Sequence, residues 1–115
     1  MAIFYRKYEE SWAKEYEKYK SLINEAIKED PDLQEDFNIY IENWEEYHNN
    51  EVEFYKSMEI SVHDTGTIVG PNMIKFSMWS YREQSLKLIR FYDELMLGRG
   101  WQWEYDISTA ISFES

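Results

Sequence analysis

Residues 29–64, EDPDLQEDFNIYIENWEEYHNNEVEFYKSMEISVHD, contain a helix start, an aromatic stripe and a local charge balance of −11, equal to the net charge of the whole 115-residue chain. Pro31 disfavours the helical conformation at Asp30, so a preceding helix has to end before it. Asp30 can then cap a second helix whose first position is Pro31, with Asp32 near its positive end. The stretch therefore predicts a turn between two helices and the start of the second.

Apolar and aromatic residues recur every three or four positions on both sides of this turn, as they do on the buried face of a helix. They predict one helix from about Ile3 to Glu29 and another from Pro31 to about Met58. The second helix is either continuous or broken near Asn49 and Asn50, because Asn50 with an acidic residue three positions later can form a new cap. The first stripe is Phe4, Tyr8, Trp12, Tyr16, Tyr19, Ile23 and Ile27; the second is Leu33, Phe37, Tyr40, Ile41, Trp44, Tyr47 and His48, continuing through Tyr55 and Met58.

After Met58 the apolar pattern changes to alternation, which is typical of strands. Turn residues divide it into segments at 59–63, 67–69 and 73–78, and these predict a three-stranded meander. Ser80 with Glu83 predicts the capping box of a further helix, which Gly98 ends. The longest alternation, over residues 101–114, predicts a fourth strand.

The predicted fold class is α+β in a single domain, residues 1–115. It consists of an N-terminal helical hairpin over 1–58, followed by a small antiparallel sheet of about four strands with one helix before the last strand. A first helix of about 26 residues would be ~39 Å long, whereas a compact chain of this length has a radius of gyration near ~13 Å. We therefore expect the hairpin to form an elongated arm or side of the molecule.

The net charge of −11 is concentrated in the same stretch, where twelve acidic residues accompany one lysine. A charge that served only solubility would be mixed over the whole surface, so this block predicts a surface that contacts a basic partner. At 100° per residue, four glutamates fall on one side of the predicted second helix, opposite its aromatic stripe: Glu35, Glu42, Glu46 and Glu53. Ile39, beside Asn43, is a candidate apolar anchor among them. The candidate partner-binding residues are Glu29, Asp30, Asp32, Glu35, Asp36, Ile39, Glu42, Asn43, Glu45, Glu46 and Glu53.

Several classes of site are excluded or disfavoured by composition. The chain has no cysteine, which excludes disulfides, thiolate zinc sites, iron–sulfur clusters and cysteine nucleophiles. The N-terminus lacks the apolar core of a secretory signal and no apolar run reaches ~20 residues, so we expect a soluble cytoplasmic protein without membrane contact. Strong acidity disfavours direct nucleic-acid binding. We expect no cofactor and no metal.

Four short motifs resemble chemical sites, and each has a simpler structural interpretation. Asp64-Thr65-Gly66 resembles the loop of aspartic proteases, but the helical sequence before it indicates an ordinary turn. Glu45 and His48 have the spacing of carboxylate-bridged di-metal sites, which need a second such motif. The other two are His63 with Asp64 as an acid–base pair and Trp101 with Trp103 as a stacking platform, for which a strand-end histidine and a core stripe are simpler.

A row of carboxylates along a helix can occupy a groove built for phosphates and can steer association with Arg and Lys. The sequence therefore predicts a non-enzymatic inhibitor, a monomer or small homodimer, that covers the basic nucleic-acid-binding surface of a partner such as a nuclease or defence effector. In size and charge it is similar to phage anti-CRISPR and anti-restriction proteins that mimic DNA, which would act in the host cytoplasm. The alternatives are an immunity protein that neutralises a nuclease toxin, and a structural or assembly protein that uses the aromatic hairpin.

Overall fold

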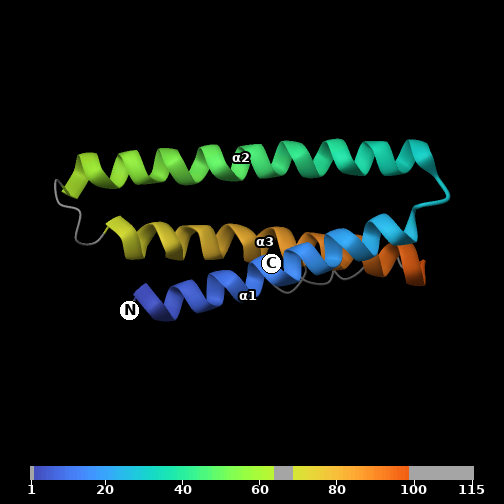
Figure 1. The fold of residues 1–115 in the computed structure, drawn as a ribbon, viewed down its shortest axis with the longest axis horizontal. Coiled ribbons are helices and arrows are strands. Elements are labelled where there is room, and N and C mark those ends of the chain that lie inside the picture. Colours follow the sequence, from blue (N-terminus) through green and yellow to red (C-terminus); the bar gives the residue numbers. More distant parts are fainter. Residues whose placement is uncertain (1, 64–68, 99–115) are drawn as a thin grey trace, which may run out of the picture.

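In a computed structural model, the protein consists of three long helices (Figure 1): α1 (Ala2–Ala26), α2 (Pro31–His63) and α3 (Val69–Leu97). The structure describes residues 2–63 and 69–98. α1 and α3 run in one direction and α2 runs in the other; α3 packs against both of its neighbours and more extensively against α1. The radius of gyration is 17.3 Å, above the ~13 Å expected for a compact chain, so the molecule is elongated as expected.

The predicted α+β fold class is wrong for the described residues, which contain helices and no strand. Residues 59–63 form the last turn of α2, and residues 73–78 lie inside α3. Ser80, expected to cap a new helix, lies in the middle of α3. Of the predicted strand 67–69, Val69 begins α3; the remainder of that strand, the turn 64–66 and the predicted last strand over 101–114 lie outside the described residues.

α2 continues to His63 because nothing in its sequence interrupts it. Between Pro31 and Gly66 there is no glycine or proline, and once a helix has formed, each added residue gains one hydrogen bond at little cost. The alternation of Ile60 and Val62 that predicted a strand does not reflect a buried face, because these side chains are 48% and 70% exposed. Asn49 and Asn50 likewise sit inside the helix without breaking it.

α3 was not recognised as one helix because its buried face is largely polar. Ser77, Gln84 and Ser85 are buried together with Leu88, at the three- and four-residue spacing of a helix. The Ser85 hydroxyl donates to the carbonyl of Trp12 on α1 at 3.1 Å, and a buried residue this small allows the two helices to approach closely. Throughout the described part of the chain, every buried side-chain nitrogen and oxygen has a hydrogen-bond partner, as stability requires.

The turn between α1 and α2 confirms the sequence prediction. Pro31 is the first residue of α2, and the Asp30 carboxylate accepts a hydrogen bond from the backbone N–H of Leu33 at 3.1 Å, which is an N-cap. α1 ends at Ala26, three residues before the predicted Glu29. The predicted end of α3 is also confirmed, since Gly98 has a φ of 64° and its N–H donates to the carbonyl of Glu94 at 2.9 Å.

The apolar core lies toward the end of the bundle where α1 turns into α2. Trp44 packs against the buried Tyr16 with ring centroids 4.9 Å apart, so aromatic side chains join α1 to α2. Four residues of the predicted stripes, Tyr8, Leu33, Tyr47 and Met58, are exposed instead. The buried apolar residues are Tyr16, Ile23, Ile27, Phe37, Ile41 and Leu88.

Candidate functional site

Four glutamates form a row along the solvent-facing side of α2, and we call Glu35, Glu42, Glu46 and Glu53 the acidic row. All four are exposed, and α2 is continuous between the first and the last. Eighteen residues separate the ends of the row, which therefore extends over ~27 Å of helix axis at 1.5 Å per residue. The structure thus places the acidic row together on one helix, opposite the buried side of α2.

The other predicted partner-binding residues are also at the surface, with one exception. Ile39, the candidate anchor, is 49% exposed, so its side chain is available to a partner. Asp30 lies at the α1–α2 turn, where its carboxylate is already engaged in capping α2. Exposed alongside them are Glu29, Asp32, Asp36 and Asn43.

Glu45 is the exception, because it is only partly exposed and binds to α1. Its carboxylate accepts hydrogen bonds from the Tyr16 hydroxyl at 2.7 Å and from Lys20 Nζ at 3.1 Å. Burial by itself would raise the pKa of Glu45, but the bonds from Tyr16 and Lys20 outweigh burial and the pKa is lowered. Burial and the bond to Glu45 raise the pKa of Tyr16. Glu45 therefore stabilises the packing of α2 on α1 and does not belong to the acidic row.

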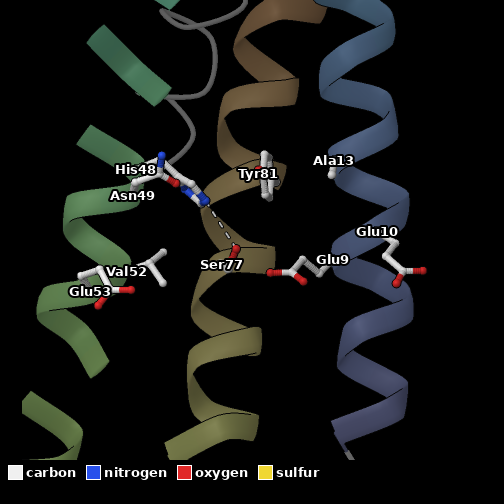
Figure 2. A pocket seen from close by; sticks show the side chains of 9 residues that line it. All are labelled: Glu9, Glu10, Ala13, His48, Asn49, Val52, Glu53, Ser77 and Tyr81. Carbon is white, nitrogen blue, oxygen red and sulfur yellow. Dashed lines mark hydrogen bonds between the residues drawn. The ribbon is translucent and has the colours of Figure 1, made fainter. Parts of the chain in front are cut away.

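A second candidate site is an open cleft of about 410 Å³ around His48 (Figure 2). All three helices contribute to its walls, and Figure 2 shows His48 extending from α2 toward Ser77 on α3. The lining residues are Glu9, Glu10, Ala13, His48, Asn49, Val52, Glu53, Ser77 and Tyr81.

His48 is only 5% exposed and its ring contacts side chains of both α2 and α3. Its ring stacks on Trp44 with centroids 4.9 Å apart and contacts Tyr81 at 4.5 Å. Its Nδ1 lies 2.8 Å from the Ser80 hydroxyl, and its Nε2 lies 3.4 Å from that of Ser77. Burial lowers the pKa of His48, although nearby carboxylates oppose the shift, so the neutral imidazole is favoured in the folded protein.

His48, Ser77 and Ser80 satisfy one another's hydrogen-bonding groups, and their arrangement differs from that of a catalytic triad. In a Ser–His–Asp triad a carboxylate orients Nδ1, whereas here the Ser80 hydroxyl occupies that position. Ser77 is itself buried, at 6% exposure. The sequence does not reveal either serine as a partner of His48, because the pattern over 73–78 predicts a strand and Ser80 with Glu83 predicts a cap. The three-residue spacing of Ser77 and Ser80, which places both on one face of a helix, is the available signal.

The Glu45-x-x-His48 motif does not form a metal site, since the two side chains turn to different partners. In the described ranges, no group of three or more His, Asp or Glu side chains is placed to hold a metal ion. The Asp64-Thr65-Gly66 motif and the Trp101 and Trp103 pair lie outside those ranges, and His63 is the last residue of α2. None of the helices in the described ranges has the length and apolar character needed to cross a membrane.

Comparison with known proteins gave no match, either to a protein-family model, to a curated protein or to a solved structure.

Proposed function

We propose that this protein is a non-enzymatic inhibitor or interaction protein that binds the basic, nucleic-acid-binding surface of a partner protein through the acidic row. One observation carries the proposal: six acidic residues lie exposed along one unbroken helix, Asp32, Glu35, Asp36, Glu42, Glu46 and Glu53. Lys56 is the single basic residue of that helix, so α2 presents an almost unopposed negative charge.

The spacing of the charges supports the comparison with a nucleic acid. From Asp32 to Glu53, α2 carries six exposed carboxylates over ~32 Å, or one per ~6 Å of axis. One strand of duplex DNA carries a charge every ~3.4 Å of axis, so α2 has about half that density. Such a row can pair with several of the Arg and Lys side chains of a phosphate-binding groove and can accelerate encounter with them.

Charge reversal on α2 tests this proposal. The partner is first captured from the lysate of the cells in which the protein acts, and its release by excess duplex DNA shows that the captured surface binds nucleic acid. We expect the variant Glu35→Lys/Glu42→Lys/Glu46→Lys to associate with that partner at least about tenfold more slowly and to lose most of the salt dependence of association.

The matched control is Glu83→Lys/Asp93→Lys/Glu94→Lys, which makes the same change in net charge at exposed positions of α3. It should associate nearly as fast as the wild type. If the two triple variants slow association equally, net charge alone is responsible and the proposed role of α2 fails. The immunity protein relies on the same surface. If the captured partner is a nuclease toxin and only the α2 variant associates with it more slowly, the protein is an immunity protein.

An assembly protein is a second candidate, because one half of α2 exposes apolar side chains of the kind that form subunit contacts. Native mass measured by sedimentation separates the two functions. A monomer or small homodimer supports the inhibitor, whereas concentration-dependent growth to larger species supports assembly.

A further inference from the structure

From Tyr47 onward, α2 exposes a second surface of opposite character to the acidic row. Tyr47, Phe54, Met58 and Val62 are 61%, 64%, 43% and 70% exposed, and at 100° per residue they fall within one 80° sector of the helix. We call these four residues the distal strip. Four large exposed apolar side chains on one helix face are unusual for a surface that only meets water.

The acidic row runs beside the distal strip on the same helix. Glu46 and Glu53 lie about 100° around the helix from the strip, separated from it by small polar residues such as Asn50 and Ser57. Glu51 lies within the strip, where its carboxylate accepts a hydrogen bond from the Tyr47 hydroxyl at 2.7 Å. A ligand that covers the strip therefore meets carboxylates along one edge and at one end.

We propose that the distal strip and the acidic row together bind a basic amphipathic helix of the partner, with its apolar face on the strip and its Lys or Arg side chains on Glu46 and Glu53. This inference rests on the proposed function and specifies the chemistry of the partner. Apolar anchors set the lifetime of such a complex, whereas the flanking charges set the encounter rate and the orientation.

Charge complementarity favours this occupant over a second copy of the chain. A second copy carries the same net charge of −11 and would bring further carboxylates against Glu46, Glu51 and Glu53. Like charges placed together at an interface oppose association. A basic helix removes this repulsion and replaces it with attraction.

The length of the chain beyond Gly98 determines which part of its own C-terminal segment could compete as the occupant. Leu95 near the end of α3 and Leu33 near the start of α2 line the same apolar groove, so α3 ends beside the opposite end of α2. Phe54 lies ~32 Å along α2 from Leu33. The seven residues from Gly98 to Tyr105 span at most ~25 Å when fully extended, whereas the fifteen residues from Gly98 to Phe113 span up to ~50 Å, so the crosslinking experiment below has to separate this segment from the peptide.

Two synthetic helical peptides test the proposal by isothermal titration calorimetry. The first has Leu on one face and Lys on the other; the second has the same number of Lys with Gln in place of Leu. We expect the Leu/Lys peptide to bind the full-length protein with one site and at least about tenfold more tightly than the Gln/Lys peptide. Equal affinities overturn the role of the strip but leave the acidic row intact, whereas no binding of either peptide contradicts the proposed function itself.

Variants then locate the binding. Phe54→Ser/Met58→Ser should weaken the Leu/Lys peptide at least about tenfold without changing its salt dependence, and Glu46→Gln/Glu53→Gln should reduce the salt dependence. Met96→Ser on α3, where the side chain is 55% exposed, is the matched control and should bind like the wild type. Equal loss in the control and in the strip variant overturns the assignment.

A photo-crosslinking residue at position 54 of the full-length protein identifies any other occupant. Crosslinks to the Leu/Lys peptide support the proposal. Crosslinks formed without peptide, either to a second copy or to residues 99–115, show that the strip is already covered within or between copies of this chain and overturn it.

Discussion

The two halves of α2 have the same backbone conformation but different surroundings. In the half from Pro31 to His48, Phe37, Ile41 and His48 are buried against α1 and α3. In the half after His48, no described side chain is buried. Tyr55 packs there on α3, where its ring stacks on that of Phe76 with the ring centroids 4.4 Å apart. The helix of α2 thus continues beyond its well-packed part, and tertiary stabilisation is concentrated in its first half.

The largest expected difference between the halves concerns two phenylalanines of the same helix. Phe37→Ala should lower the free energy of unfolding by about 3 kcal/mol, because it removes a buried side chain and leaves a cavity. Phe54→Ala should change it by about 0.5 kcal/mol or less, because Phe54 is 64% exposed. Urea titrations of both variants measure the difference, and equal costs would contradict the unequal packing of the halves.

A smaller effect is expected at the adjacent glutamates Glu45 and Glu46. Glu45→Ala removes the acceptor of the Tyr16 and Lys20 hydrogen bonds and should cost about 1 kcal/mol, with water compensating in part because the Glu45 side chain is 41% exposed. Glu46→Ala removes a solvent-facing carboxylate and should leave the free energy of unfolding within about 0.5 kcal/mol.

The same two variants show whether stability and partner binding depend on different glutamates. Glu46→Ala should slow association with the basic partner, whereas Glu45→Ala should not when the protein remains folded. A slower association of the Glu45 variant alone would place the interaction surface on the α1 side of α2.

What could be predicted from the sequence was set by residues whose effects are local. The Pro31 and Asp30 pair determines the start of α2, and Gly98 the end of α3, because a cap requires only its neighbouring backbone groups. The exposure of the acidic row also followed from sequence, since its position on α2 depends only on helical period.

What could not be predicted depends on contacts between distant residues. Ser77, Gln84 and Ser85 are buried because they bond to His48, Tyr40 and Trp12, which lie on other helices, and no local pattern reveals that. Glu45 was grouped with the exposed acids for the same reason, because its partners Tyr16 and Lys20 are far away in sequence. A buried polar face conceals a helix from any analysis that counts hydrophobic positions.

His48, at the junction of the two halves, should make stability depend on pH. Burial lowers the pKa of His48 from its usual 6.5, against the opposing effects of Glu51, Glu9 and Glu45. Below pH 6.5 the unfolded chain therefore binds a proton at this site more readily than the folded protein does. Stability from this residue is fully present above pH 6.5 and is lost as the pH falls from 6.5 toward the lowered pKa.

Urea titrations across this pH range, comparing wild type with His48→Gln, measure the contribution of His48. The variant should lose the part of the pH dependence that begins near 6.5. The dependence due to Glu45 remains, because its stabilisation is fully present above the usual pKa of 4.5 and is lost as the pH falls from 4.5 toward the lowered pKa. An unchanged pH profile in the variant would show that His48 is not protected from protonation in the folded protein.

The smallest expected effect tests whether the two halves of α2 form one continuous helix. The sign of the change in the free energy of unfolding decides between the two possibilities. Asn50 lies exposed within α2, where alanine has the higher helix propensity, so Asn50→Ala should raise the free energy of unfolding by about 0.5 kcal/mol. If the helix instead broke at this point and Asn50 capped a new one, the same change would lower the free energy of unfolding by about 1 kcal/mol. Asn38→Ala, at an exposed position in the first half of α2, is the matched control and should give a gain of similar size. A gain at both positions means that one continuous helix joins the packed half of α2 to the distal strip, whereas a gain at 38 with a loss at 50 would separate them.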